Sequence, residues 1–264
     1  RGVKMIRLIS SHEEKRDFLE SLDEKSNEKI RVLREYAFRG IADELILGFR
    51  TEDDNSALII TSRNECVLIT EDAKLIECIS KVNSKDPRDE LLELMLEYSS
   101  DDIYELENLE SSIVDMEEEL FGGARPDKAG LKQIVVRRKE IMFKKQYYER
   151  MELLTDDLAE LDKTFSYLDK RFDKLYSFIL RVQEYLNHVS EMYQAQIDIE
   201  QNNLMKFFTV VTSIFAPLTL ITGWYGMNLK LPEFGWKFGY LYVSILSLSV
   251  VLGLIYVFKK KRIL

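Results

Sequence analysis

The most distinctive pattern along the chain is a pair of uncharged segments near its C-terminal end. Residues 207–229 and residues 238–258 contain no Asp, Glu, Lys or Arg. At ~1.5 Å per helical residue, segments of this length cross a hydrocarbon core of ~30 Å. Two such segments in tandem make buried helices of a soluble protein the weaker interpretation. We therefore predict transmembrane helices at 205–225 and 238–258, joined by a short extracytoplasmic loop at 226–237.

Basic residues predict the orientation of these helices. A tail at 259–264 follows the second helix directly and begins with four consecutive basic residues, and Lys206 flanks the first helix. In the loop, Lys230 and Lys237 are partly offset by Glu233. By the positive-inside rule both termini lie in the cytoplasm, which predicts a multi-pass protein of the cell (inner) membrane. The basic residues of the tail are Lys259, Lys260, Lys261 and Arg262.

Residues 1–90 have the short β-branched and alternating segments of a mixed α/β domain. They contain no Gly-rich phosphate loop, no nucleophile elbow and no Cys/His cluster, so we expect neither an enzyme nor a bound cofactor. The expected strands are 4–9, 44–50, 56–61 and 65–70, and the expected helices are 12–38 and 72–82.

Residues 91–204 are predicted to form a helical hairpin and a long stalk helix. Gly122-Gly123 with Pro126 marks the turn of the hairpin. Residues 101–119 hold nine acids and no base, whereas residues 125–150 hold nine bases and three acids. Antiparallel pairing would set these charges side by side, and two separately solvated helix faces are the alternative. Apolar residues recur along the first arm in steps of three and four, at Leu106, Leu109, Ile113, Met116 and Leu120.

The stalk is predicted from an absence of helix breakers. No Gly or Pro occurs between Leu131 and Ala216. A break is expected near 153–155, where Thr155 can cap a new helix, and a single helix of ~100 Å is expected to run from there to Gly223. Its apolar positions step by three and four at Leu158, Leu161, Phe165, Leu168, Phe172, Leu175, Ile179, Val182, Leu186, Val189 and Tyr193.

A second periodic line follows the same helix into the membrane segment. Its members are mostly small or polar and lie at Asn202, Met205, Thr209, Thr212, Ala216, Thr219 and Gly223. Such a face indicates either tight helix packing or the wall of a watery pore. Extended toward the N-terminus, the same line meets the stalk acids Glu184, Glu191 and Asp198. Helix packing gives no reason for carboxylates there, so the pattern favours a cation pathway.

Charge supports this division of the chain. The 264 residues carry a net charge of −9, but residues 1–204 have a net charge of −15 and residues 205–264 one of +6. A partner of the second part is the lipid bilayer. The acidic remainder argues against a nucleic-acid partner.

The loop after the first membrane helix carries a further motif, Tyr225-Gly226-Met227-Asn228, followed by Pro232-Glu233. Together with Pro217-Leu218-Thr219 and the basic tail, it resembles the CorA family of magnesium channels. The resemblance implies an α+β cytoplasmic domain, a long helical stalk and two C-terminal transmembrane helices, assembled as a homopentameric, funnel-like channel. It implies that the first membrane helix lines the pore.

The resemblance also implies roles for single residues. Gly226, Met227 and Asn228 would form the selectivity filter, whose oxygens accept hydrogen bonds from the waters of a hydrated Mg²⁺. Glu233 would concentrate cations at the mouth. Apart from the resemblance, the change from acids to hydroxyls along the line makes Met205, with Phe208, the candidate gate, and packing against lipid or another helix is the alternative for Met205. The four basic residues of the tail are expected to act as a topological anchor, and an inner ring of cations around the pore is the alternative. Mg²⁺ would be substrate and regulatory ligand, for which the candidates are Asp169, Asp173, Asp86 and Asp89.

Two other functions remain open from the sequence. A relative of the same class would move Zn²⁺, Co²⁺ or Ni²⁺, although Met227 in the loop favours magnesium. A membrane-anchored scaffold without transport would have the same helices but would not depend on Asn228.

Overall fold

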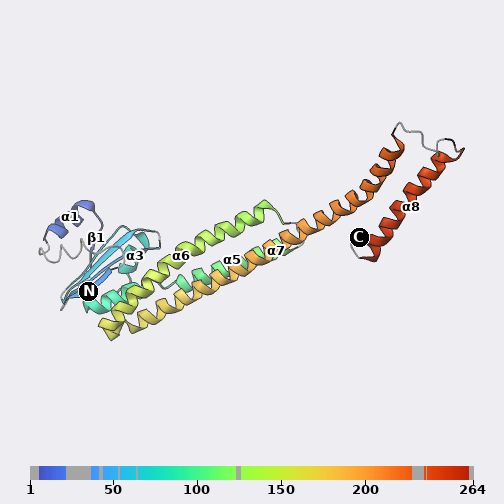
Figure 1. Ribbon diagram of the computed structural model, residues 1–264. Helices are drawn as coiled ribbons and strands as arrows, with labels where there is room; N and C mark the ends of the chain where they lie inside the picture. Colours follow the sequence, from blue (N-terminus) through green and yellow to red (C-terminus); the bar gives the residue numbers. More distant parts are fainter. Residues whose placement is uncertain are drawn as a thin grey trace. The chain divides into compact units, whose positions relative to one another are not determined.

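The computed structural model describes residues 6–21, 37–41, 44–52, 54–63, 65–122, 126–227, 235 and 237–261 (Figure 1). The chain divides into two compact units, Arg1–Glu191 and Met192–Leu264. The first unit holds a sheet and most of the helices, and the second holds the two longest apolar segments.

A five-stranded sheet in the order β1-β5-β4-β3-β2 forms the start of the first unit. Strand β1 is parallel to β5, with Ile9 opposite Ile69, and the remaining pairs are antiparallel. Strand β5 is an interior strand between β1 and β4, and all five of its residues are buried. The bounds are β1 Ile6–Ile9, β2 Ala37–Ile41, β3 Glu44–Arg50, β4 Ser56–Thr61 and β5 Cys66–Thr70.

One expectation for this domain is wrong. A helix was expected over 12–38, but helix α1 spans His12–Ser21 and Ala37–Ile41 forms strand β2. Strand β2 pairs with β3 along its full length, with Phe38 opposite Leu47. This pairing with the adjacent strand, Ile41 opposite Glu44 at its near end, outweighs the helical pattern read from residues 12–38. Residues 22–36 lie outside the described part of the chain.

Two short helices follow the sheet, and each begins at an aspartate that caps it. Asp72 accepts a hydrogen bond from the backbone N–H of Leu75 (2.9 Å) at the start of α3, Ala73–Ile79. Asp86 accepts one from the N–H of Arg88 (2.9 Å) at the start of α4, Pro87–Tyr98. Asp and an N1 proline are typical helix-start residues.

The hairpin has its two arms where the pattern predicts them. Helix α5 spans Asp102–Phe121, helix α6 spans Lys128–Leu161, and all five periodic apolar residues of α5 are buried. The charges of the two arms pair at few places. Lys144 contacts Glu105 (3.0 Å), and Gln133 donates to Glu119 (3.5 Å). Most acids of α5 and bases of α6 instead lie on exposed faces, which agrees with the solvated alternative.

The break before the stalk lies farther along than expected. Thr155 is buried inside α6 and its hydroxyl donates to the carbonyl of Glu152 (3.1 Å), so it caps nothing. The chain turns at Asp162, whose carboxylate accepts from the N–H of Thr164 (3.0 Å) and binds Arg88 (2.9 Å). These bonds lower the pKa of Asp162. We call the periodic apolar residues of the stalk, predicted from Leu158 to Tyr193, the seam. Leu161 was expected in the seam but is exposed at the end of α6.

The stalk helix α7 spans Ser166–Tyr225, after a single 3₁₀ turn at Lys163–Phe165. Its 60 residues correspond to ~90 Å. Every predicted seam residue from Phe165 to Tyr193 is buried. Helix α8 spans Gly239–Lys260, and both α7 and α8 contain stretches long and apolar enough to cross a membrane.

Candidate functional site

The seven residues of the predicted pore line all lie exposed on one face of α7. Val210 is buried and Ile214 half-buried on the other side, about 200° around the helix from Thr212. The line is therefore free to face water or another subunit. Its members are Asn202, Met205, Thr209, Thr212, Ala216, Thr219 and Gly223.

Two hydroxyl groups of this face are oriented by their own helix. Thr209 donates to the carbonyl of Met205 (2.8 Å) and Thr219 donates to the carbonyl of Phe215 (2.9 Å). Since each hydroxyl proton is used in the helix, the oxygen lone pairs remain as acceptors. Acceptors at these two positions suit a hydrated cation, whose waters present hydrogens outward.

The described part of the filter motif is a turn that requires glycine. The N–H of Gly226 donates to the carbonyl of Thr222 (2.8 Å), and a Cβ at Gly226 would lie 2.8 Å from that same oxygen. The N–H of Met227 donates to the carbonyl of Trp224 (3.4 Å), and the Met227 side chain is exposed. Asn228 and Glu233 lie outside the described residues, so their roles stay predictions.

The stalk acids occupy the face opposite the buried seam. Glu184, Glu191 and Asp198 are all exposed, whereas Leu186 and Val189 between them are buried. Asp198 accepts a hydrogen bond from Gln194 (3.2 Å). The acids therefore keep their charge toward solvent, as a cation pathway needs.

The candidate gate residues are apolar side chains without cover in the chain. Met205 is 69% exposed and Phe208 63% exposed. The rings of Phe207 and Phe208 meet edge to face at 5.8 Å. Large unburied apolar groups at this level require lipid or a second copy to cover them.

Helix α8 ends in the described basic residues of the tail. Lys259 and Lys260 lie in its last turn, and the N–H of Lys261 donates to the carbonyl of Val257 (3.0 Å). Cations here complement the negative end of the helix dipole. Arg262 lies outside the described residues.

The candidate regulatory carboxylates do not form a metal site within one chain. Asp86 is used as a helix cap, and Asp89 is exposed one turn later. Asp169 and Asp173 lie near Asp156, and burial, Asp156 and Asp173 together raise the pKa of Asp169. Within the described ranges, no three His, Cys, Asp or Glu residues are arranged to hold a metal ion.

The sequence analysis missed Asp156 and its neighbour Glu152 in this acidic group. Burial and the nearby acids, Asp156 first, raise the pKa of Glu152. With the helix break placed at 153–155, their position against α7 was not apparent. The spacing of carboxylates on α6 would have been the signal.

The first unit also contains a buried polar cluster that no sequence motif predicts. Asp102, at the start of α5, is 1% exposed and contacts Lys74 of α3 (3.4 Å). Its second carboxylate oxygen and the buried hydroxyls of Tyr147 and Tyr148 have no hydrogen-bond partner. Burial raises the pKa of Asp102 to about 6, although Lys74 opposes the shift. A buried, half-satisfied carboxylate is costly to keep ionised.

Lys144 links three elements beside this cluster. Its ammonium binds Glu52, in the β3–β4 connection, and Glu105 of α5. Although burial acts against it, these carboxylates raise the pKa of Lys144. The ammonium thus ties the sheet domain to both arms of the hairpin.

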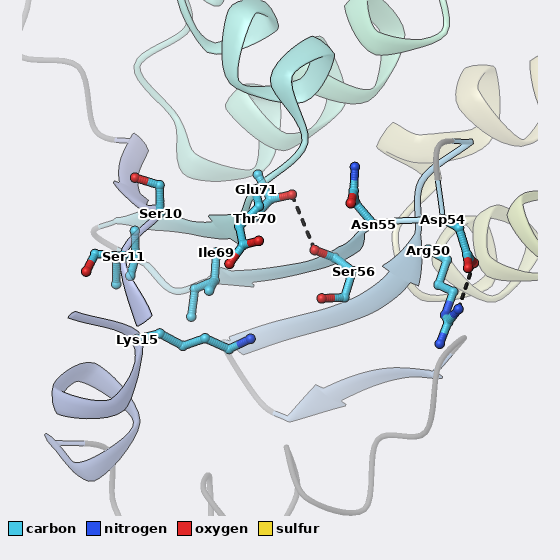
Figure 2. Close-up of a pocket in the computed structure, with 11 residues that line it drawn as sticks. Ser10, Ser11, Lys15, Arg50, Asp54, Asn55, Ser56, Ile69, Thr70 and Glu71 are labelled. Atoms are coloured by element: carbon cyan, nitrogen blue, oxygen red, sulfur yellow. Dashed lines mark hydrogen bonds and ion pairs between the residues drawn. The ribbon is translucent and has the colours of Figure 1, made fainter. Parts of the chain in front are cut away.

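A polar cavity of about 400 Å³ lies at the carboxyl ends of β1 and β5 (Figure 2). Lys15 of α1 and Arg50 of β3 line it, and Glu71 and Asp54 balance their charge. Arg50 already pairs with Asp54 (2.7 Å). The charges of this lining are balanced, so the cavity offers a cation no net attraction.

Comparisons with known proteins agree with these features. The family model described as CorA-like Mg²⁺ transporter protein matches residues 54–260. A magnesium transport protein CorA of Wolinella succinogenes is 33% identical over 135 residues, covering 50% of this chain and 42% of the relative. A cobalt/magnesium transport protein CorA of Thermotoga maritima is 29% identical over 190 residues, covering 67% and 53% respectively. The chain thus spans about half the length of the curated relatives it matches.

The fold is shared with solved structures. The CorA magnesium transporter of Methanocaldococcus jannaschii matches with a TM-score of 0.75 at 22% identity, over 96% of this chain and 89% of that chain. The full-length CmaX protein matches with a TM-score of 0.76 at 16% identity, over 97% and 88%. The α+β domain, long helix and two apolar C-terminal helices are therefore confirmed. Because the family model matches residues 54–260, most of the sequence, the chain belongs to the CorA-like Mg²⁺ transporter family, a family of transporters rather than enzymes.

Proposed function

We propose that this protein forms a homopentameric channel for Mg²⁺ in the cell (inner) membrane, with both termini in the cytoplasm. The observation that carries the proposal is the exposed face of α7, on which six small or polar residues and Met205 form a line that leads to Gly226 and Met227. Five copies of this face around an axis give a closed, water-filled path. The basic residues after α8 support the orientation.

The selection step acts on the hydrated ion. Mg²⁺ loses its waters reluctantly, so neutral acceptors can bind it through those waters and still release it. The acceptors in the path are the hydroxyl oxygens of Thr209 and Thr219 and, by the motif, the amide of Asn228. The membrane potential supplies about 4.6 kcal/mol per 100 mV for a divalent ion.

Regulation by Mg²⁺ is proposed to act between neighbouring copies. No described group of three ligands lies within one chain, and an ion that keeps several of its waters needs only one or two carboxylates, so Asp169 or Asp86 and an acid of the neighbouring subunit would be enough to hold it. Bound Mg²⁺ would hold the acidic cytoplasmic parts together, and its loss would let them repel one another.

Co²⁺ is a second candidate substrate, because the Thermotoga maritima relative carries the name cobalt/magnesium transport protein. The seven residues of the pore line include no His or Cys, the ligands that would select Co²⁺ strongly, although His188 lies on the same line in the stalk, between Glu184 and Glu191. We therefore expect both ions to enter and Mg²⁺ to be the physiological one.

Uptake into proteoliposomes under an inside-negative potential tests the function. Wild-type protein should take up Mg²⁺ and, more weakly, Co²⁺. Asn228→Ala should lower Mg²⁺ uptake about a hundredfold because it removes one water-facing acceptor from each subunit. Asn203→Ala, an exposed position off the pore line, is the matched control. Normal uptake by Asn228→Ala would leave the scaffold function as the better account.

A further inference from the structure

The hairpin presents an acidic surface on the side of α5 that faces away from its buried seam. We define the acidic α5 face as Tyr104, Glu107, Ser111, Asp115 and Glu118, all of them exposed. Helix α5 contains no Lys or Arg. The ion pairs that the structure describes for α5 involve Asp102 and Glu105, near its first turn, and not this face.

Helix α6 presents a surface of the opposite charge. We define the basic α6 face as Lys132, Val135, Val136, Lys139, Met142 and Phe143, all of them exposed. Val135 is 63% exposed and Phe143 55% exposed, and the ammonium of Lys139 lies 5.7 Å from the Phe143 ring centroid. The one acid in this stretch, Glu140, pairs with Arg137 (2.8 Å). The face is therefore both apolar and positively charged, a combination typical of an interaction surface.

Most of the charge on the two faces is solvated within one chain. Ile113 of α5 and Ile134 of α6 are buried, and most residues of the two faces lie on the opposite sides of their helices. Asp115, Lys132 and Val136 also line a cavity between the arms, so one edge of each face is turned toward the other arm. The remaining exposed residues are accessible to a complementary surface on another copy.

We propose that the basic α6 face of one copy docks against the acidic α5 face of the next copy around the ring. This inference rests on the homo-oligomeric assembly proposed above. Because two different surfaces meet, the contact is head-to-tail, the kind that closes into a ring of identical subunits. Opposite charges along both faces also set the order and register of the subunits.

The two faces lie at the same height, by which we mean the same position along the axis of the hairpin. Within the chain, Gln133 contacts Glu119 and Lys144 contacts Glu105, which fixes the antiparallel alignment of α5 and α6. Rotation about an axis parallel to the hairpin leaves these heights unchanged. Glu118 of one copy then lies level with Lys132 of its neighbour. Each face also extends about 20 Å along its helix.

Disulfide crosslinking between singly substituted chains is the direct test. Full-length chains carrying Glu118→Cys or Lys132→Cys are co-expressed with different tags, assembled in proteoliposomes and oxidised. The native Cys66 and Cys78 are buried and contribute no background. We expect a covalent heterodimer from the mixture and none from either variant alone. Pairing Glu118→Cys with Lys85→Cys, an exposed position away from both faces, is the control.

Charge reversal provides a second measurement. K132E/K139E should raise the concentration at which the oligomer half-dissociates about tenfold at low salt, with a smaller effect at high salt. Adding E107K/E118K should restore assembly, whereas K85E/K163E should leave it unchanged. Rescue by the second reversal is a result that a folding defect would not give.

The outcomes separate this interface from the proposed function. An intact wild-type ring without crosslinked heterodimer overturns the interface and leaves the channel proposal standing. A monomeric wild-type chain overturns both. A K132E/K139E variant that assembles normally but loses binding to phosphatidylglycerol vesicles would assign the basic α6 face to lipid instead.

Discussion

The two halves of helix α7 share one backbone but differ in what buries their apolar residues. In the stalk half, residues 166–204, Phe172 and Ile179 are completely buried by the chain's own fold. In the span half, residues 205–225, Phe215 is 62% exposed and Val210 alone falls among the buried apolar residues that the structure describes. The stalk thus obtains its hydrophobic stabilisation within one subunit. The span can obtain it only from lipid or from other copies.

Two phenylalanines on this helix give the largest test of the comparison. Phe172→Ala leaves a cavity in a closed seam and should lower the free energy of unfolding by about 3–5 kcal/mol. Phe215→Ala removes an exposed ring and should change it by less than about 1 kcal/mol. Denaturant unfolding of the detergent-solubilised chain, followed by circular dichroism, measures both. Equal losses would mean that the span half is also packed within the monomer.

The same contrast explains what the sequence could predict. Local periodicity predicted the stalk seam, in which every expected residue from Phe165 to Tyr193 is buried. It also placed β3 and β4 at their observed bounds. Strand β2 was missed because its five residues, Ala37–Ile41, were read as the end of a helix over 12–38, although its partner β3 begins only three residues later, at Glu44. The helix break was misplaced because Thr155 and Asp162 are both good caps, and the bond from Arg88 to Asp162 decides between them.

The candidate site divides in the same way. The pore line follows from spacing on one helix, so its exposure could be predicted from residue types alone. The cluster around Asp102 combines side chains from α3, α5 and α6, and no single segment shows it. Sites assembled across elements need the packing, whereas sites on one helix need only its period.

A pH dependence confined to the first unit is the next prediction. The pKa of Asp102 is raised from 3.8 to about 6. Folding therefore favours the protonated carboxyl, and this stabilisation is complete below pH 3.8 and is lost as the pH rises through 6. The loss amounts to about 3 kcal/mol. Asp102→Asn should be more stable than wild type at pH 7.5, and the difference between them should shrink toward pH 4.

Thermal unfolding at several pH values measures this difference. Glu107→Gln, an exposed acid on the same helix, is the control. A wild type that loses stability relative to Asp102→Asn on acidification would show that Lys74 and the tyrosines favour the ionised carboxylate instead.

The span half should respond to a change at the candidate gate and not at a comparable stalk position. Met205→Ser replaces a ring of exposed apolar groups by hydroxyls, which weakens the resistance of a narrow pore to wetting. We expect a leak about tenfold above that of the wild type at millimolar internal Mg²⁺. Met192→Ser, also exposed but off the pore line, should still close. Full closure by Met205→Ser would move the gate toward Thr219.

The basic residues after α8 should give the smallest effect on transport. Lys259 and Lys260 complete the last turn of the helix and Lys261 caps it, so their local contribution is that of cations at a helix C-terminus, about 0.3–1 kcal/mol each. Their larger effect is expected on topology, because the positive-inside rule predicts that they hold the C-terminus in the cytoplasm. Replacing these three and Arg262 with Gln should invert a fraction of the chains, because only Lys206 would remain to orient the first span. Flux per correctly oriented channel should stay within about twofold of wild type, measured as uptake normalised to protease-accessible tails. A clear rise in normalised flux with correct topology would instead assign the tail to a cationic ring that opposes ion passage at the inner mouth. The span half would then have an electrostatic barrier in addition to the apolar constriction expected at Met205.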